Sequence, residues 1–288
     1  MLWVLLSLLS ALASASQDAW TKKFFSHLNT YEMLIYPLLY SLPFFIVMLG
    51  FVPVPELDRI FFWCWGISLP LNAISSLLYI RAIKLSPLSL TLPYMAFTPV
   101  FMIGTGMIVL GESPSAWGVG GILTTCLGGY VLNVDPRRRS LLAPFKALAR
   151  EPGSWTMLIV AFLYSLAAVV GKKGILHSSP LFFTMSFFVA LNLIVTCGLV
   201  ASGKARWATF KKYPLQGGLV GLLMFLHALF HTYAIVMVKA VYMIAVKRTS
   251  ILWGVAYGYL LFKEERIVIR FGGALCMVVG ALIIMFKG

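Results

Sequence analysis

The chain has 288 residues, of which 60% are hydrophobic and only 11% are charged, and its mean hydropathy is +0.92. Soluble domains carry about 25% charged residues, so this composition excludes an ordinary soluble protein. The formal net charge of +14 could suggest a nucleic-acid-binding protein. The basic residues, however, lie mostly at the ends of apolar runs, where they orient a membrane protein or contact anionic lipid.

Apolar stretches follow one another along the chain, and each is long enough to cross about 30 Å of hydrocarbon as a helix. They are apolar on every face, which favours helices over the short alternating strands of a β-barrel. The first stretch resembles the core of a signal peptide but lacks its basic start, so we interpret it as a spanning helix. The expected helices cover residues 2–20, 31–51, 60–80, 87–110, 114–132, 155–172, 180–201, 215–237, 240–262 and 266–286.

The chain repeats itself weakly at an offset of 150 to 152 residues. The matched positions are Glu112 with Glu264, Gly120–Gly121 with Gly272–Gly273, Gly128 with Gly280, and Lys22–Lys23 with Lys172–Lys173. Each half then contains five helices, and an odd number makes the two halves enter the membrane in opposite senses. The sequence therefore predicts an all-α polytopic membrane protein, with ten transmembrane helices arranged as two inverted five-helix repeats.

Three segments follow from this repeat. We expect a first five-helix repeat over residues 1–133, a basic amphipathic linker over 134–154, and a second five-helix repeat over 155–288. Solute carriers built in this way bind their substrate near the middle of the membrane, between the halves.

Residues 78–133 resemble the repeat of the drug/metabolite transporter superfamily in its EamA-type ten-helix form. The shared features are the step from Ala82 to Pro87, the helix containing Pro99, the Gly111–Glu112 pair that closes this helix, and the glycine-spaced helix after it. Residues 233–286 carry a degenerate version, in which Lys263 replaces the glycine of that pair. The resemblance implies a transporter, in a superfamily whose members move amino acids, drugs, sugar conjugates and phosphorylated metabolites.

Lys247 and Arg248 are adjacent cations inside the expected helix 240–262. Each cation costs about 2.5–3.5 kcal/mol of insertion free energy at the centre of a spanning helix. A function or a stabilising partner must therefore explain why the pair is there. The segment 245–254, "AVKRTSILWG", is similar to the Lys–Arg pair in the ninth helix of the plastid sugar-phosphate translocators, which implies contact with an anionic group of the substrate. The lysine which that branch carries in its fourth helix is missing here. Interfacial anchoring or a structural ion pair is the alternative to substrate binding.

Several other polar side chains are candidates for the wall of a substrate cavity. A helical stripe of polar residues follows the helix 60–80, and Tyr94 lies between two prolines that free backbone carbonyls and so favour a bent, cavity-facing helix. His227 and His231 are one turn apart and could share a metal, but no third ligand is evident; cavity hydrogen bonds or packing are the alternatives. The stripe contains Asn72, Ser75, Ser76 and Tyr79.

Asp18 is the one carboxylate well inside an expected span. Lys22 lies one helical turn further on, so a helical ion pair between these two side chains is one interpretation. The other is a site for a proton or cation that is coupled to transport.

We therefore expect a secondary transporter of the inner or plasma membrane that moves a small organic solute by alternating access. We expect an anionic metabolite, a carboxylate or a phosphate, in a cavity between the helices 60–80, 87–110, 215–237 and 240–262. The expected partners are this substrate and membrane lipids; a homodimer could form, and neither nucleic acid nor a metal or other cofactor is expected. The alternatives are an exporter of amino acids or other neutral or amphipathic metabolites, and a lipid-linked phosphate flippase.

Two groups of motifs are absent from the sequence. Without GxxxxGK[ST] there is no phosphate-binding loop for ATP, so coupling to an ion gradient or to exchange is expected. Without GxSxG, HExxH or a carboxylate pair, we do not expect an enzyme.

Overall fold

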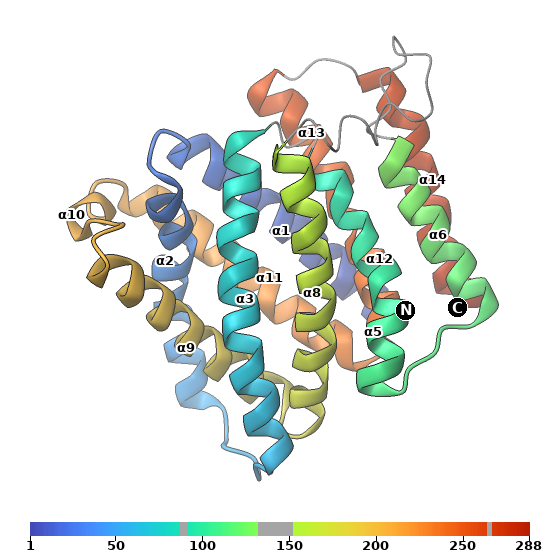
Figure 1. Ribbon diagram of the computed structural model, residues 1–288, viewed down its shortest axis with the longest axis horizontal. Coiled ribbons are helices and arrows are strands. Elements are labelled where there is room, and N and C mark those ends of the chain that lie inside the picture. Colours follow the sequence, from blue (N-terminus) through green and yellow to red (C-terminus); the bar gives the residue numbers. More distant parts are fainter. Residues whose placement is uncertain (87–90, 132–151, 264–266) are drawn as a thin grey trace.

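The computed structural model describes residues 1–86, 91–131, 152–263 and 267–288, and these residues form helices and no strands (Figure 1). The expectation of an all-α membrane protein is confirmed. In the described residues, six helices are long and apolar enough to span a membrane, and they are α1, α2, α3, α8, α9 and α11. The predicted linker 134–154 lies outside the described residues except for its last three, because α8 begins at Pro152.

The elements of the first half are α1 (Leu2–Phe25), α2 (Thr30–Phe51), α3 (Arg59–Leu85), the 3₁₀-helix η1 (Leu92–Phe97), α5 (Thr98–Leu110) and α6 (Ala116–Val131). Those of the second half are α8 (Pro152–Leu176), α9 (Pro180–Ala201), the single turn α10 (Trp207–Phe210), α11 (Pro214–Val236), α12 (Ala240–Lys247), α13 (Ser250–Phe262) and α14 (Ile267–Lys287).

Local sequence explains where several helices begin. Asn29, Asp58 and Ser179 lie immediately before α2, α3 and α9, and each side chain accepts a hydrogen bond from the backbone N–H three residues further on. Such caps satisfy one of the N–H groups that the first turn of a helix leaves without a partner.

Two of the ten predicted helices are divided into shorter elements, and the count of ten transmembrane helices is not confirmed. In place of the helix 87–110, the described residues form η1 and then α5, and Pro99 lies in the first turn of α5. In place of the helix 240–262, the chain forms α12 and then α13. Proline explains the first interruption because it lacks an N–H group and clashes with the preceding turn.

The second interruption contains no proline. The N–H of Thr249 donates to the carbonyl of Val246 at 3.0 Å, and the N–H of Ile251 donates to the carbonyl of Arg248 at 3.0 Å. These bonds join residues three apart, so the helix tightens to a 3₁₀ turn between α12 and α13. A short 3₁₀ stretch in the middle of a helix often marks a functional hinge.

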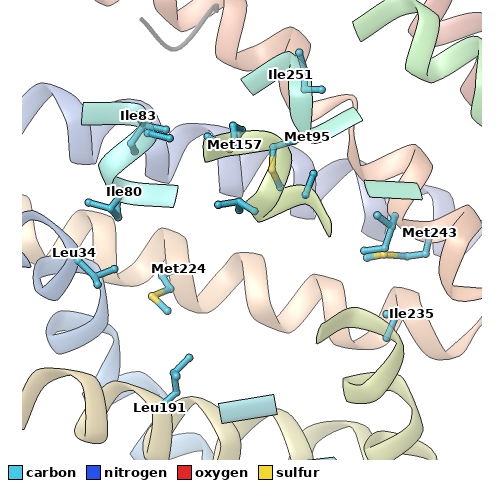
Figure 2. Close-up of a cluster of buried hydrophobic side chains, with 14 of the residues drawn as sticks. Leu34, Ile80, Ile83, Met95, Met157, Leu191, Met224, Ile235, Met243 and Ile251 are labelled. Atoms are coloured by element: carbon cyan, nitrogen blue, oxygen red, sulfur yellow. The ribbon is translucent and has the colours of Figure 1, made fainter. Parts of the chain in front are cut away.

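The first helix of each half packs against the other half. Helix α1 contacts α11, α12 and α13, while α8 contacts α3, η1 and α5. Figure 1 shows α3 and α8 side by side, and also α6 and α14, which form an extensive contact. A buried hydrophobic core with residues from both halves, some of which Figure 2 shows, joins the chain into one bundle.

Equivalent positions of the two halves have similar surroundings. Helices α5 and α13 begin 152 residues apart, at Thr98 and Ser250, and both end at a residue with positive φ, Gly111 (68°) or Lys263 (53°). The ammonium of Lys22 donates to the carbonyl of Ser86 at 2.8 Å, and that of Lys172 donates to the carbonyl of Val238 at 2.7 Å. The two donors, Lys22 and Lys172, are separated along the chain by the offset found in the sequence, and so are the two acceptors, Ser86 and Val238.

Glycine allows α6 and α14 to approach closely. A Cβ atom on Gly128 would lie 2.6 Å from the carbonyl oxygen of Gly273 and 2.7 Å from the backbone nitrogen of Met277, and a Cβ atom on Gly280 would lie 2.6 Å from the carbonyl oxygen of Gly121. Small residues are enriched at such contacts because lipid provides no hydrophobic force between helices, so association depends on close packing.

We expect Gly128→Ala and Gly120→Ala, both in α6, to change stability in opposite directions. Alanine at position 128 would collide with the backbone of α14 and should lower the thermal midpoint of the purified protein. A Cβ atom on Gly120 would meet nothing within 4 Å, and alanine is favoured over glycine in a helix by about 1 kcal/mol, so this control should be neutral or stabilising. Thermal unfolding in detergent measures both effects; equal midpoints for the two variants would contradict the close contact.

Candidate functional site

A cavity of about 250 Å³ lies between the two halves of the bundle. Its walls contain residues of α1, α2, α3, η1, α8, α9, α11 and α12. The prediction named the helices 60–80, 87–110, 215–237 and 240–262, and all four contribute. It missed α2 and α9, whose lining side chains are almost all apolar, and also α1 and α8, although α1 contributes the polar residues Ser14, Gln17 and Asp18.

Lys247 and Arg248 lie at the interruption between α12 and α13, and both line the cavity with only 8% of their surface exposed. Lys247 is the last residue of α12, where the carbonyl end of the helix dipole favours a cation. The two cations are therefore buried inside the protein, at the junction of two helices.

The histidine pair of α11 holds Lys247 in position. The Lys247 ammonium donates to Nε2 of His227 at 2.6 Å and to Nδ1 of His231 at 3.0 Å. Each acceptor nitrogen must carry a lone pair, so His227 has its proton on Nδ1 and His231 has its proton on Nε2. The described residues contain no group of three or more side chains that could hold a metal, and the pair acts here as a hydrogen-bond acceptor for lysine.

Arg248 forms no ion pair with the described residues, and its Nε atom is buried without a hydrogen-bond partner. A buried donor that lacks a partner costs about 1–3 kcal/mol, and more when it is charged. A guanidinium that faces a cavity in this state is suited to receive an anion, because its planar fork matches a carboxylate or a phosphate.

Asp18 lies in the same cavity and is 8% exposed. The hydroxyl of Tyr79, on α3, donates a hydrogen bond to its carboxylate. No ion pair between Asp18 and Lys22 occurs in the described part of the chain, so that interpretation is wrong. Helix α1 continues to Phe25, which places Asp18 within the helix and not at its end.

Of the remaining residues that were predicted to line the cavity, some do so and others do not. Asn72 lines the cavity, and its amide donates to the Ser68 carbonyl at 2.9 Å. Ser75 is fully buried outside the lining, and its hydroxyl donates to the carbonyl of Leu71 at 2.6 Å. Its neighbour Ser76 lines the cavity instead, because adjacent helical residues point about 100° apart.

Tyr94 is buried in η1 and does not line the cavity, although Met95 next to it does. The 3₁₀ turn rotates these side chains relative to a continuous α-helix. Tyr164 on α8 does line the cavity and was missed. It lies eight residues before Lys172, about two helical turns, and Lys172 also lines the cavity. This spacing was the signal from which the sequence could have identified Tyr164.

Lys172 and Glu112 form a buried ion pair that the sequence did not predict. Their side chains meet at 2.6 Å and are 5% and 20% exposed. The other carboxylate oxygen of Glu112 accepts the N–H of Ala240, the first residue of α12, at 2.8 Å. The pair therefore ties the end of α5 to α8 and to the start of the helix that carries Lys247. It also neutralises Lys172, which lines the cavity.

Comparisons with known proteins agree with this architecture. Residues 1–134 match the model of the EamA-like transporter family. A solved structure whose title reads "Crystal structure of protein" covers 98% of this chain and 96% of its own, with a TM-score of 0.66 at 14% identity, which shows a shared fold. No curated protein sequence matches this chain.

These findings define a multi-pass integral membrane protein of the transporter class. The resemblance to the drug/metabolite transporter superfamily is confirmed, because residues 1–134 match the model of the EamA-like transporter family. Proteins of this family are membrane transporters of small solutes.

We expect Lys172→Met to destabilise the protein by about 3 kcal/mol, because removing one partner of a buried ion pair leaves the other charge uncompensated. Lys173→Met is the matched control, since Lys173 is half-buried and has no ion pair with a described residue. The double variant Lys172→Met, Glu112→Gln should lose less than the sum of its single changes. Chemical or thermal unfolding in detergent tests this; equal losses for Lys172→Met and Lys173→Met would contradict the role of the pair.

Proposed function

We propose that the protein is a secondary transporter that carries a small organic anion across the membrane by alternating access. The observation that carries the proposal is the charge of the cavity. Among the described residues, Lys247 and Arg248 face a single unpaired carboxylate, Asp18, while Lys172 is neutralised by Glu112. One positive charge is left over, and a bound anion of charge −1 would balance it.

The cost of this arrangement supports a functional reason for it. A buried cation without a partner is expensive, because the protein interior replaces its hydration poorly. Burying Arg248 without a fixed acceptor gains nothing for folding. The same guanidinium gains strongly when a substrate brings the missing acceptor, since hydrogen bonds between two charged groups are about twice as strong as neutral ones.

The two interrupted helices support alternating access. Carriers with inverted repeats place their substrate at discontinuous helices near the middle of the membrane, and one repeat rocks against the other around that site. Here the interruptions at Thr98 and Ser250 are 152 residues apart. The parallel contacts of Lys22 with Ser86 and of Lys172 with Val238 further support two inverted five-helix halves.

We further propose Asp18 as the coupling group. An anion that binds to Arg248 enters the same cavity as the Asp18 carboxylate, and the two negative charges repel each other. Protonation of Asp18 would remove this repulsion, which supports movement of the anion together with a proton.

One observation favours a second candidate, the exporter of amino acids. A zwitterion could place its carboxylate on Arg248 and its ammonium on Asp18, because both side chains line the cavity. In this alternative the ammonium of the amino acid would have to share the Asp18 carboxylate with Lys247 and Arg248, because Asp18 is the one carboxylate among the described residues that line the cavity.

We expect Arg248→Gln to abolish transport while the protein still folds, since glutamine keeps a polar side chain but removes the charge. Arg81→Gln is the matched control, because Arg81 is an exposed arginine of α3. A thermal-shift screen of the wild type against carboxylates, phosphate esters and amino acids identifies the anion, which raises the midpoint by binding the folded state. Uptake of that anion into proteoliposomes then compares the variants; equal rates for Arg248→Gln and the wild type would refute the site.

A further inference from the structure

The cavity has an apolar wall formed by α2 and α9. Helix α2 contributes only Leu34, Pro37 and Leu38 to it. The contribution of α9 is four apolar side chains and one hydroxyl, that of Thr184, which is already hydrogen-bonded to the hydroxyl of Thr232. This wall therefore offers a bound molecule mainly apolar contact, and its one hydroxyl already has a hydrogen-bond partner.

The wall is held in place by its own packing. The rings of Phe183 and Phe187 stack at 5.8 Å, and Phe188 stacks on Phe45 of α2 at 4.8 Å. Figure 2 shows Leu34, Leu191 and Met224 close together on α2, α9 and α11, and all three line the cavity. An apolar surface that exists without a ligand needs little rearrangement to bind one.

The charged and polar groups come from other elements. Arg248 and Lys247 belong to α12 and its junction with α13, Asp18 belongs to α1, and Tyr79 and Tyr164 belong to α3 and α8. Helix α12 packs against α1, α5 and α11, whereas α2 and α9 pack against each other. In the view of Figure 1, α2 and α9 lie on one side of α3 and α8, and α12 lies on the other.

We infer that the substrate is an amphiphilic monoanion: one carboxylate-sized head for Arg248 and Lys247, and a compact apolar body for the wall of α2 and α9. This inference rests on the proposed function and specifies its substrate class. A hydroxyl-rich body, such as that of a sugar phosphate, would lose its hydrogen bonds to water against this wall, in which the Thr184 hydroxyl is the one polar side chain that lines the cavity. While Asp18 is ionised, a dianionic head would exceed the single positive charge that the described residues leave unbalanced.

Five probes test this with the purified full-length protein, by calorimetry or competition. They are 3-phenylpropanoate, acetate (the head alone), 3-phenylpropanamide (the body without the charge), phenylalanine (the same acid with an added ammonium) and glycerol 3-phosphate. We expect 3-phenylpropanoate to bind roughly 100-fold more tightly than acetate, from the burial of its apolar body. The amide, phenylalanine and glycerol 3-phosphate should each bind at least about tenfold more weakly than 3-phenylpropanoate.

Two variants separate the head from the body. Leu191→Asn places an amide of similar size on the apolar wall and should weaken 3-phenylpropanoate about tenfold while leaving acetate unchanged. Arg248→Gln should weaken both acids. If Leu191→Asn does not fold, the series of probes on the wild type decides the question by itself.

The outcomes distinguish this inference from the proposed function. If glycerol 3-phosphate binds most tightly and Arg248→Gln removes its binding, the carrier of anions stands and the amphiphilic substrate is refuted. If phenylalanine binds more tightly than 3-phenylpropanoate, the monoanion is wrong and the amino acid exporter is favoured. If the amide binds as well as the acid and Arg248→Gln changes nothing, both proposals fail.

Discussion

The burial of two adjacent cations is the constraint on which the rest of this structure depends. Lys247 and Arg248 are each 8% exposed in the interior of a membrane protein, where an unbalanced charge is costly. The fold accommodates Lys247 through two histidine nitrogens and a helix C-terminus. It leaves Arg248 facing a cavity with its Nε unpaired. This difference separates the side chain that the protein itself stabilises from the one that is available to a ligand.

The helix that carries these cations is fixed at both of its ends. At its start, Glu112 accepts the N–H of Ala240 and pairs with Lys172 of α8. At its end, the 3₁₀ turn around Thr249 separates α12 from α13. A short helix held in this way can keep two charges at a defined depth, and the turn gives it a place at which to bend. Binding and movement would then involve the same segment, α12 and the turn that follows it.

Prediction from sequence succeeded where one helix can be judged by itself. Apolar length indicated the spanning helices, and two glycines that the repeat matches, Gly128 and Gly280, lie at the close contact of α6 with α14. It failed where several helices meet. Of the four residues predicted as the polar stripe of α3, Asn72, Ser76 and Tyr79 line the cavity and Ser75 does not. Asp18 had an apparent partner one turn away in Lys22, but Tyr79, 61 residues further on, hydrogen-bonds to it.

The sequence by itself determined that this chain crosses a membrane repeatedly, that several of its positions match at an offset of 150 to 152 residues, and that Lys247 and Arg248 need an explanation. These properties depend on composition and on spacing along the chain, because the bilayer requires each helix to satisfy its own backbone. Only the tertiary structure decided that the α12–α13 helix breaks without a proline and that His227 and His231 hold Lys247. It also decided that Glu112 neutralises Lys172 and that α9 supplies an apolar wall. Each of these features depends on which side chains of different helices come into contact. The local sequence pattern of one helix does not specify those contacts.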